Sequence, residues 1–488
     1  MAPRQTPTPG SHCLFFAGDV FVVRLAADQT SAQDRAYVRT TLGRAAVRRA
    51  EVVDHAETGT PLAHAEWHDI AMTRVETDVF EARIPLSEPG FFQAKSFVLP
   101  ADSSEPIWPA GEDIFLHVQP AEFAAQNSLY NAFVRQFGPT RAGGLAPRAE
   151  HAARELEKNG YTAIPPSGTF RDLAARLDLI MDQMGFRIVQ LLPIFPTPNV
   201  YARMGRFGSP FAALDFFQVD PALAEFDRRS TPLGQFRELA DAIHARGGRL
   251  VLDIPLNHTG WGSALQNHHP EWFERNADGT FASPGAWGVV WEDLTELAYE
   301  SKKLWAAMSK ALLFWCEHGA DGFRCDAGYM IPAPVWEYVT AKVRLQFPDT
   351  LFFLEGLGGK RSTTENLLGQ GGMNWAYSEL FEMYDRTDLD QYLPYAGSVS
   401  AERGLLLHFA ETHDNNRLAV RGERYARMRT ALAALCSPCG AFGITNGVEW
   451  LAKEKVDVHG APSLDWGANP NMVEELRRLN AVLATHPC

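Results

Sequence analysis

Four apolar segments of this 488-residue sequence run directly into residues that are capable of acid–base chemistry. The first segment leads into Asp253, Asn257 and His258, and the second carries Arg324 and Asp326. Side chains two positions apart on a strand point to the same face, so the Arg324 guanidinium is expected beside the Asp326 carboxyl group. Such a neighbour favours the ionised carboxylate and holds it in one rotamer.

The other two segments lead into further acidic groups. Leu351–Leu354 precedes Glu355, and Leu405–Phe409 is followed by His413 and Asp414. A lone acid at a strand end is more often a helix cap or an ion-pair partner. Three carboxylates at one edge would repel one another, which drives their pKa values apart and leaves one ionised and another protonated. Cleavage of a glycosidic bond needs this combination of a nucleophile and an acid.

From about residue 127 onward, short apolar runs alternate with amphipathic helical patterns. The apolar runs predict strands at Leu129–Phe133, Ile188–Leu192, Leu250–Ile254, Gly322–Asp326, Leu351–Glu355, Leu405–Phe409 and Ala441–Thr445, with a weaker one at Asn374–Ala376. The helical patterns predict helices at Phe170–Met184, Pro232–Ala245, Lys302–Glu317, Val335–Gln346, Arg424–Leu435 and Met472–Ala484. Such alternation is typical of parallel βαβ units, and about eight repeats fit a (β/α)8 barrel.

The sequence therefore predicts an α/β protein whose TIM barrel spans residues 127–488. A tryptophan-rich insertion is expected after the third strand, at about residues 259–300, on the side of the barrel where active sites lie. Residues 12–122 carry short apolar runs separated by turn-rich pieces, which predict an N-terminal all-β sandwich. Residues 1–11 are rich in proline and threonine and are expected to form a flexible tail.

The composition is that of an ordinary globular protein, with 46% hydrophobic and 21% charged residues. The net charge of −14 argues against a nucleic acid or an anionic membrane as partner. No run of 18 apolar residues and no secretory leader is evident, so we expect a cytoplasmic protein. Cys436 and Cys439 form a lone C-x-x-C pair, for which chance pairing is favoured over a redox or metal site.

The four polar segments resemble the four signature regions of the alpha-amylase family, glycoside hydrolase family 13. The matching positions are Asp253, Asn257 and His258 in the first region, Gly322, Arg324 and Asp326 in the second, Glu355 in the third, and Phe409, His413 and Asp414 in the fourth. Their order is that of the family, and the resemblance covers roughly residues 127–485. The N-terminal segment resembles the accessory domains of intracellular members that act on glycogen and maltodextrin.

This resemblance implies a role for each acidic position. Asp326 would be the nucleophile that forms a covalent glycosyl-enzyme, and Glu355 would be the general acid and then the general base. Asp414 would hold the distorted sugar ring through its hydroxyl groups. Arg324 would orient Asp326.

The resemblance also implies that His258 and His413 hydrogen-bond the sugar. The alternative for His258 is a core histidine bonded to Asp253, and Asp253 itself is expected to be structural. Asn257 matches a calcium ligand of the family, but calcium takes about six to eight oxygen ligands and no second set is evident. We therefore predict no cofactor, with calcium supported by Asn257 alone.

Three positions bear on how the substrate is held. Phe211 stands where many family members place a tyrosine under the sugar, and stacking or core packing are equally compatible with it. Tyr329 and Met330 replace the lysine and histidine that many amylases carry on the leaving-group side. Tyr329 is therefore a candidate for stacking on a glucose, whereas Met330 fits packing better.

The function predicted from these residues is a retaining hydrolase of α-glucosidic bonds, acting on glycogen, maltodextrin or a related α-glucan. A transglycosylase of the glucanotransferase or debranching type that uses the same intermediate is the alternative. A catalytically silent glucan-binding protein is a remote third, because every expected catalytic position is filled. Most family members continue beyond the barrel with another β domain, whereas this chain stops at Cys488.

Overall fold

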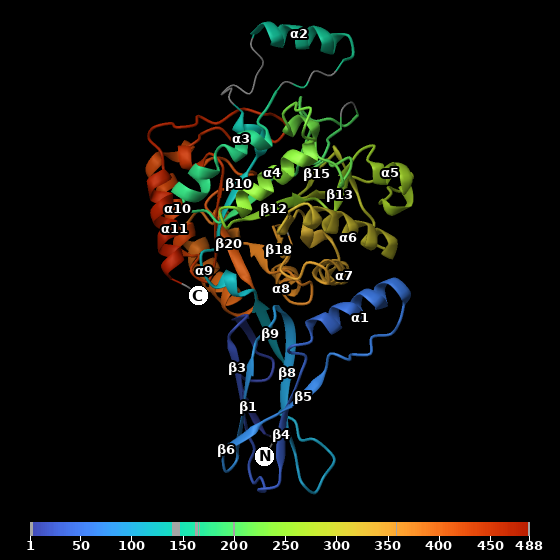
Figure 1. Cartoon of the computed structure of the whole chain (residues 1–488), viewed down its shortest axis with the longest axis vertical. Coiled ribbons are helices and arrows are strands. Elements are labelled where there is room, and N and C mark those ends of the chain that lie inside the picture. Colours follow the sequence, from blue (N-terminus) through green and yellow to red (C-terminus); the bar gives the residue numbers. More distant parts are fainter. Residues whose placement is uncertain are drawn as a thin grey trace.

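Eight parallel strands close into a barrel at the centre of the molecule (Figure 1). The computed structural model describes residues 3–138, 147–161, 164, 166–198, 201–357 and 359–486, so Met1, Ala2 and Cys488 lie outside the described residues. The barrel strands are β10 (Ser128–Ala132), β11 (Ile188–Leu191), β12 (Arg249–Ile254), β17 (Gly322–Cys325), β18 (Leu351–Leu354), β19 (Trp375–Tyr377), β20 (Leu405–Phe409) and β21 (Gly440–Thr445). Pairing of β10 with β21 closes the ring, which confirms the predicted barrel.

Alternating side chains of these strands build two separate cores. Leu351 and Phe353 of β18 point into the barrel, where they meet inward-facing residues of the other strands. Phe352 and Leu354 point outward and pack beneath the surrounding helices. This alternation explains why the strands appear in the sequence as continuous apolar runs, since both of their faces are buried.

The helices around the barrel follow the predicted order, and several match closely. They are α2 (Pro147–Lys158), α3 (Phe170–Ala174), α4 (Pro232–His244), α5 (Ala264–His268), α6 (Lys302–Glu317), α7 (Ala333–Arg344), α8 (Arg361–Leu368), α9 (Arg386–Glu402), α10 (Glu423–Leu435) and α11 (Val473–Thr485). Thr231 caps α4 by accepting a hydrogen bond from the Gly234 N–H, directly before Pro232. None of the helices among the described residues is long and apolar enough to cross a membrane.

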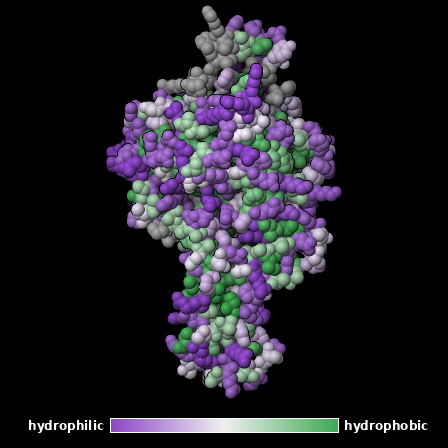
Figure 2. Space-filling model, viewed as in Figure 1, coloured by the Kyte–Doolittle hydropathy of each residue, from purple (hydrophilic) through white to green (hydrophobic). Residues whose placement is uncertain are grey.

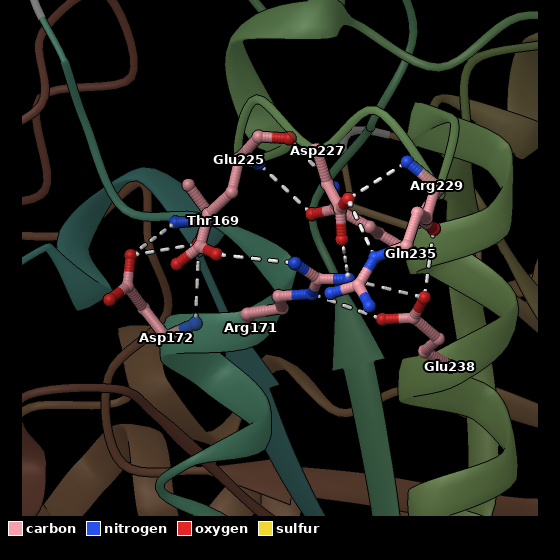
Figure 3. Close-up of polar contacts among 9 residues, drawn as sticks. Thr169, Arg171, Asp172, Glu225, Asp227, Arg229, Gln235 and Glu238 are labelled. Carbon is pink, nitrogen blue, oxygen red and sulfur yellow. Dashed lines mark hydrogen bonds and ion pairs between the residues drawn. The ribbon is translucent and has the colours of Figure 1, made fainter.

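The helix predicted at Phe170–Met184 is divided in the structure. The regular helix α3 ends at Ala174, and Asp178–Gln183 continues as a π-helical turn. Figure 3 shows how α3 is tied to α4: Arg171 lies 3.1 Å from Glu238 and 3.0 Å from Asp227. This cluster holds the two helices side by side, and α4 packs against β12.

The insertion after the third barrel strand forms a small subdomain beside the barrel rim. Its pieces are β13 (His258–Gly260), α5, the hairpin β14 (Gly285–Ala286) and β15 (Val289–Val290), and β16 (Leu294–Glu296). β13 pairs with β16, so the insertion starts and ends at one place. This pairing fixes His258, the first residue of β13, close to the end of β12.

Two sheets form the narrow N-terminal domain at the lower end of Figure 1. The first is antiparallel, and the second is mixed because β2 and β9 run parallel. The first sheet has the order β1 (Arg4–Thr6), β3 (Val20–Ala26), β7 (Val79–Pro85) and β6 (Thr73–Glu76). The second has the order β2 (His12–Phe16), β9 (Ile114–Gln119), β8 (Gly90–Leu99), β4 (Arg35–Thr40) and β5 (His68–Ala71). Apolar side chains from both sheets, such as Phe21 and Phe92, form one core between them.

Two features of this domain differ from the sequence-based expectation. Residues 4–6 are not a flexible tail, because β1 pairs with β3 and buries Gln5, which accepts hydrogen bonds from Ser96. The segment is also not purely β, since α1 (Ala45–Thr58) lies between β4 and β5. The apolar residues of α1 are mostly alanine and valine, which leave only a weak helical pattern, and the helix packs against α7 of the barrel.

A buried hydrogen bond links the first barrel strand to the segment that follows the last one. The Tyr130 hydroxyl in β10 donates to Glu449 Oε1 at 2.5 Å, and both residues are fully buried. Glu449 also accepts a hydrogen bond from the Gly447 N–H. The bond therefore pins the chain where the barrel closes.

We predict that Tyr130→Phe lowers the free energy of unfolding by about 1–3 kcal/mol, because it leaves a buried carboxyl oxygen without its donor. Urea unfolding followed by circular dichroism would measure this loss. Tyr201→Phe is the matched control, since Tyr201 is 69% exposed. An unchanged midpoint for Tyr130→Phe would show that the bond contributes nothing.

Candidate active site

The Arg324 side chain is the centre of a buried charge cluster at the carboxyl ends of the barrel strands. Its guanidinium is 1% exposed. Nη1 lies 2.8 Å from both carboxyl oxygens of Asp253 and 2.6 Å from Asp326 Oδ1. Nη2 lies 3.0 Å from Glu355 Oε2. One planar cation therefore holds three carboxyl groups, each from a different strand.

The barrel register explains why these groups meet. β12, β17 and β18 are neighbours, with Asp253 beside Arg324 and Arg324 beside Phe353. Asp326 follows β17 directly and Glu355 follows β18 directly, so both emerge at the same rim. The N–H of Ala327 donates to Glu355 Oε2 at 2.8 Å, and Ala327 adopts a φ of 46°, a conformation that is uncommon for a residue with a Cβ atom.

The surroundings favour a proton on Glu355. Burial raises the pKa of the Glu355 carboxyl to about 7, with the negative charges of Asp326 and Asp414 acting in the same direction against the Arg324 cation. Burial also raises the pKa of Asp326, and Arg324 opposes that rise. Glu355 is therefore suited to deliver a proton near neutral pH.

Both predicted histidines lie at this rim and are buried. His258 Nε2 is 3.7 Å from Asp326 Oδ2, and His413 Nε2 is 3.3 Å from Asp414 Oδ2. Burial lowers the pKa of His258 to about 4 and also lowers that of His413. The neighbour of His258 is thus Asp326, whereas Asp253 is bonded to Arg324 instead.

Phe211 lies against this group rather than apart from it. Its ring stacks on His413 with a centroid distance of 5.7 Å and an interplanar angle of 11°. The same ring packs beside the apolar cluster of Phe133, Leu192 and Val456. Both of the interpretations left open by the sequence are therefore compatible with its position.

Tyr329 lies close to the acidic pair. The charges of Glu355 and Asp326 add to the effect of burial and raise the pKa of Tyr329 to about 12. Its hydroxyl oxygen is buried and has no hydrogen-bond partner among the described residues. An unpartnered buried hydroxyl beside a reactive centre is placed to bind a polar ligand atom.

Asn257 is buried at the end of β12. Its side-chain Nδ2 donates to the Met330 sulfur at 3.6 Å, and its backbone carbonyl oxygen accepts from the Leu297 N–H. Over the part of the chain that the structure describes, no group of three or more His, Cys, Asp or Glu side chains is arranged to hold a metal ion. The Cys436 thiol is free.

Three residues of the site are absent from the sequence-based set. Gln190 Nε2 donates to Asp253 at 3.4 Å, Asn131 lies 3.4 Å from His413, and the Tyr377 ring lies 5.2 Å from the Arg324 guanidinium carbon. All three point inward, one layer below the rim. Polar side chains inside otherwise apolar barrel strands were the signal that marks them.

The raised pKa of Glu355 has a consequence for stability. An acid whose pKa rises from 4.5 to about 7 on folding binds more protons in the folded than in the unfolded chain between these pH values. The contribution of Glu355 to the free energy of unfolding of the wild type is therefore fully present below pH 4.5 and is lost as the pH rises through 7. Glutamine cannot ionise and carries no such penalty.

We predict that Glu355→Gln gains stability relative to the wild type, by about 1–3 kcal/mol, when the pH is raised from 5 to 8. Urea unfolding at both pH values would measure the change, with the exposed Glu300→Gln as control. An equal difference between variant and wild type at the two pH values would contradict a protonated Glu355.

Comparison with known sequences places this geometry in a family. The family model described as the alpha amylase catalytic domain matches residues 120–396, which is more than half of the chain. An alpha-1,4-glucan:maltose-1-phosphate maltosyltransferase of Rhodospirillum rubrum is 29% identical over 378 residues, covering 70% of this chain and 52% of that protein. A second protein of that description, from Streptomyces coelicolor, is 30% identical over 300 residues, which cover 58% of this chain and 43% of that protein. The chain thus spans about half the length of these relatives.

Solved structures show the same fold. An alpha-amylase from Lactobacillus plantarum superposes with a TM-score of 0.60 at 24% identity, over 74% of this chain and 80% of the other. A cyclomaltodextrinase superposes with a TM-score of 0.60 at 17% identity, over 99% of this chain and 85% of the other. With its closed barrel, its N-terminal sheets and the matched catalytic-domain model, the chain belongs to the alpha-amylase family of enzymes.

Proposed function

We propose that this protein is a retaining α-glucan transglycosylase in which Asp326 is the nucleophile and Glu355 the general acid and base. The observation that carries the proposal is the Arg324 cluster, which holds both carboxyl groups at hydrogen-bonding distance from one guanidinium. Retaining glycosidases need two carboxyl groups about 5–5.5 Å apart on opposite sides of the scissile bond. A cation that contacts both groups is compatible with that spacing.

The reaction has two steps. Asp326 attacks the anomeric carbon of the donor while Glu355 transfers its proton to the departing oxygen, so that one C–O bond forms and one breaks. Glu355, now ionised, then accepts the proton of an acceptor hydroxyl, which attacks the same carbon and releases Asp326. Two inversions at the anomeric carbon retain the α configuration.

Other rim residues position the sugar in this proposal. Neutral His258 and His413 offer ring nitrogens to the sugar hydroxyl groups, and the exposed Asp414 reaches the ring from the segment that follows β20. Asp414 has a side-chain exposure of 63%, which leaves its oxygens accessible to a ligand. The Phe211 ring, stacked on His413, limits how far that histidine can rotate.

Transfer is favoured over the hydrolysis expected from the sequence. The two relatives reported above are named maltosyltransferases, and their names specify an α-1,4-glucan and maltose 1-phosphate. On the leaving-group side, Tyr329 presents a buried, unpartnered hydroxyl. A hydroxyl at this position can bind an acceptor sugar and thereby compete with water.

A charged pocket beside the rim favours a phosphorylated donor. The pocket measures about 530 Å³ and is lined by Asp414, Asn415, Arg421, Lys453 and Lys455, among others. Lys453 and Lys455 make no ion pair with the described residues. Lys455 is close enough to His413 to lower the pKa of that imidazole. These cations attract a phosphate group, which a plain glucan does not carry.

Product analysis separates transfer from hydrolysis. We expect maltoheptaose alone, or maltose 1-phosphate with glycogen, to yield longer as well as shorter chains. Chromatography and NMR of the anomeric protons would identify these products. Asp326→Asn should reduce either reaction by at least about 10³-fold, because the nucleophile is removed. Shorter α-anomeric products alone would establish a hydrolase instead.

The lysine pocket provides a second test. We predict that Lys455→Gln raises the KM for maltose 1-phosphate by about tenfold, equivalent to about 1.4 kcal/mol, and leaves the KM for maltoheptaose within about twofold. Lys342→Gln, on the opposite side of the barrel, is the control. Equal effects on both substrates would contradict a phosphate contact at this pocket.

A further inference from the structure

A second cavity lies at the other end of the barrel, between the barrel and the N-terminal domain. It measures about 640 Å³ and is bordered by α1, β8 and β9 on one side and by α7 and α8 on the other. Figure 1 places these elements where the narrow domain joins the barrel, and Figure 2 shows apolar residues gathered at this junction. The catalytic rim is at the opposite ends of the strands.

One wall of this cavity is a row of stacked rings. His12 lies on Phe115 with a centroid distance of 4.6 Å and an interplanar angle of 18°. Phe115 is parallel to Phe91 within 6°, at a centroid distance of 5.9 Å. All three rings are half-buried and line the cavity. Together they give the cavity an aromatic wall against which a ring of a ligand can pack.

Most charged groups in the cavity already have partners. Arg48 pairs with Glu337 at 2.7 Å and lies 3.6 Å from Glu66, which is also 3.6 Å from His64. These contacts neutralise one side of the cavity without any ligand.

Other charged groups of the cavity are engaged as well. Arg403 pairs with Glu365 at 3.4 Å. The Arg44 guanidinium donates to the Ala65 carbonyl oxygen, and the exposed Glu112 lies at the mouth of the cavity.

Two arginines differ, because their hydrogen-bond acceptors among the described residues are all uncharged oxygens. Arg49 Nη2 donates to the Pro89 carbonyl at 3.0 Å. Arg344 donates to the Gly372 carbonyl at 2.6 Å, to the Asn374 side-chain oxygen at 2.5 Å and to the Thr350 carbonyl at 3.3 Å, and its guanidinium carbon lies 5.0 Å from the Phe352 ring. Neither makes an ion pair with a described carboxylate, although Glu88 and Asp349 attract Arg49 from a greater distance.

The two cations also act on each other. Burial and the Arg49 charge lower the pKa of Arg344 to about 9. Both side chains line this cavity and a smaller one next to it. Two neighbouring guanidiniums that repel each other and lack a counter-ion are stabilised by an anion placed between them.

We propose that this cavity binds a small organic phosphate, with the phosphate on Arg49 and Arg344 and a ring of the ligand against Phe91 and Phe115. The ring belongs to a sugar or to a nucleobase, and both kinds of ligand present the same phosphate chemistry. The site is separate from the substrate site, and its occupancy does not depend on the proposed reaction.

Isothermal titration calorimetry on the full chain tests this site with three probes: glucose 6-phosphate, adenosine 5′-monophosphate and inorganic phosphate. We expect one of the two organic phosphates to bind at least tenfold more tightly than inorganic phosphate. The probe that binds identifies the ring as a sugar or a base. No binding of either organic probe at millimolar concentration would overturn the proposal, as would equal affinity for inorganic phosphate.

Variants separate the two halves of the site. Arg49→Gln should weaken the binding of the organic phosphate at least tenfold, whereas Arg24→Gln, in the outer sheet, should leave it unchanged. Phe91→Ala should weaken the organic phosphate and leave the affinity for inorganic phosphate unchanged. Arg49 and Phe91 are half-buried, so circular dichroism should show that both variants keep the fold. Unchanged affinity in folded Arg49→Gln would overturn the assignment.

Discussion

The buried Arg324 guanidinium is the interaction on which the rest of the catalytic rim depends. A carboxyl group buried alone in a barrel would be neutral, and three of them would repel one another. Arg324 contacts Asp253, Asp326 and Glu355 at 2.6–3.0 Å and so permits all three in one place. Nη1 contacts both Asp253 and Asp326, and Nη2 contacts Glu355, so that one cation holds Asp253 together with the two groups that we assign to the reaction.

The same cluster sets the protonation of two similar groups. Asp326 and Glu355 are both buried and both contact Arg324, and burial raises the pKa of both carboxyl groups, that of Glu355 to about 7. A proton on Glu355 and a negative charge on Asp326 is the division of labour that a retaining mechanism requires. Whether water or a sugar then attacks the intermediate depends on residues outside the cluster, such as Tyr329 and Lys455.

The two ends of the barrel carry different kinds of charge. The rim concentrates carboxyl groups around one cation, whereas at the junction with the N-terminal domain two cations, Arg49 and Arg344, have no carboxylate partner in the part of the chain that the structure describes. Asn374 stands between the junction and the barrel: its side-chain oxygen accepts from Arg344 and from the Phe352 N–H of β18. Gln119 of β9 also bonds to Asn374, so the N-terminal domain is attached to the strand that leads to Glu355.

The sequence by itself determined the barrel, the order of its strands and the residues of the rim, because a buried parallel strand appears as an apolar run and its end as the first charged residue. It did not reveal α1 or α9, since α1 has few large apolar residues and α9 contains Pro394. Only the tertiary structure decided that Asp253 pairs with Arg324 rather than His258, and that Arg49 and Arg344 face one cavity. These arrangements bring together residues that are 71 to 295 positions apart in the sequence. No local pattern encodes them, because they depend on how separate strands and domains pack.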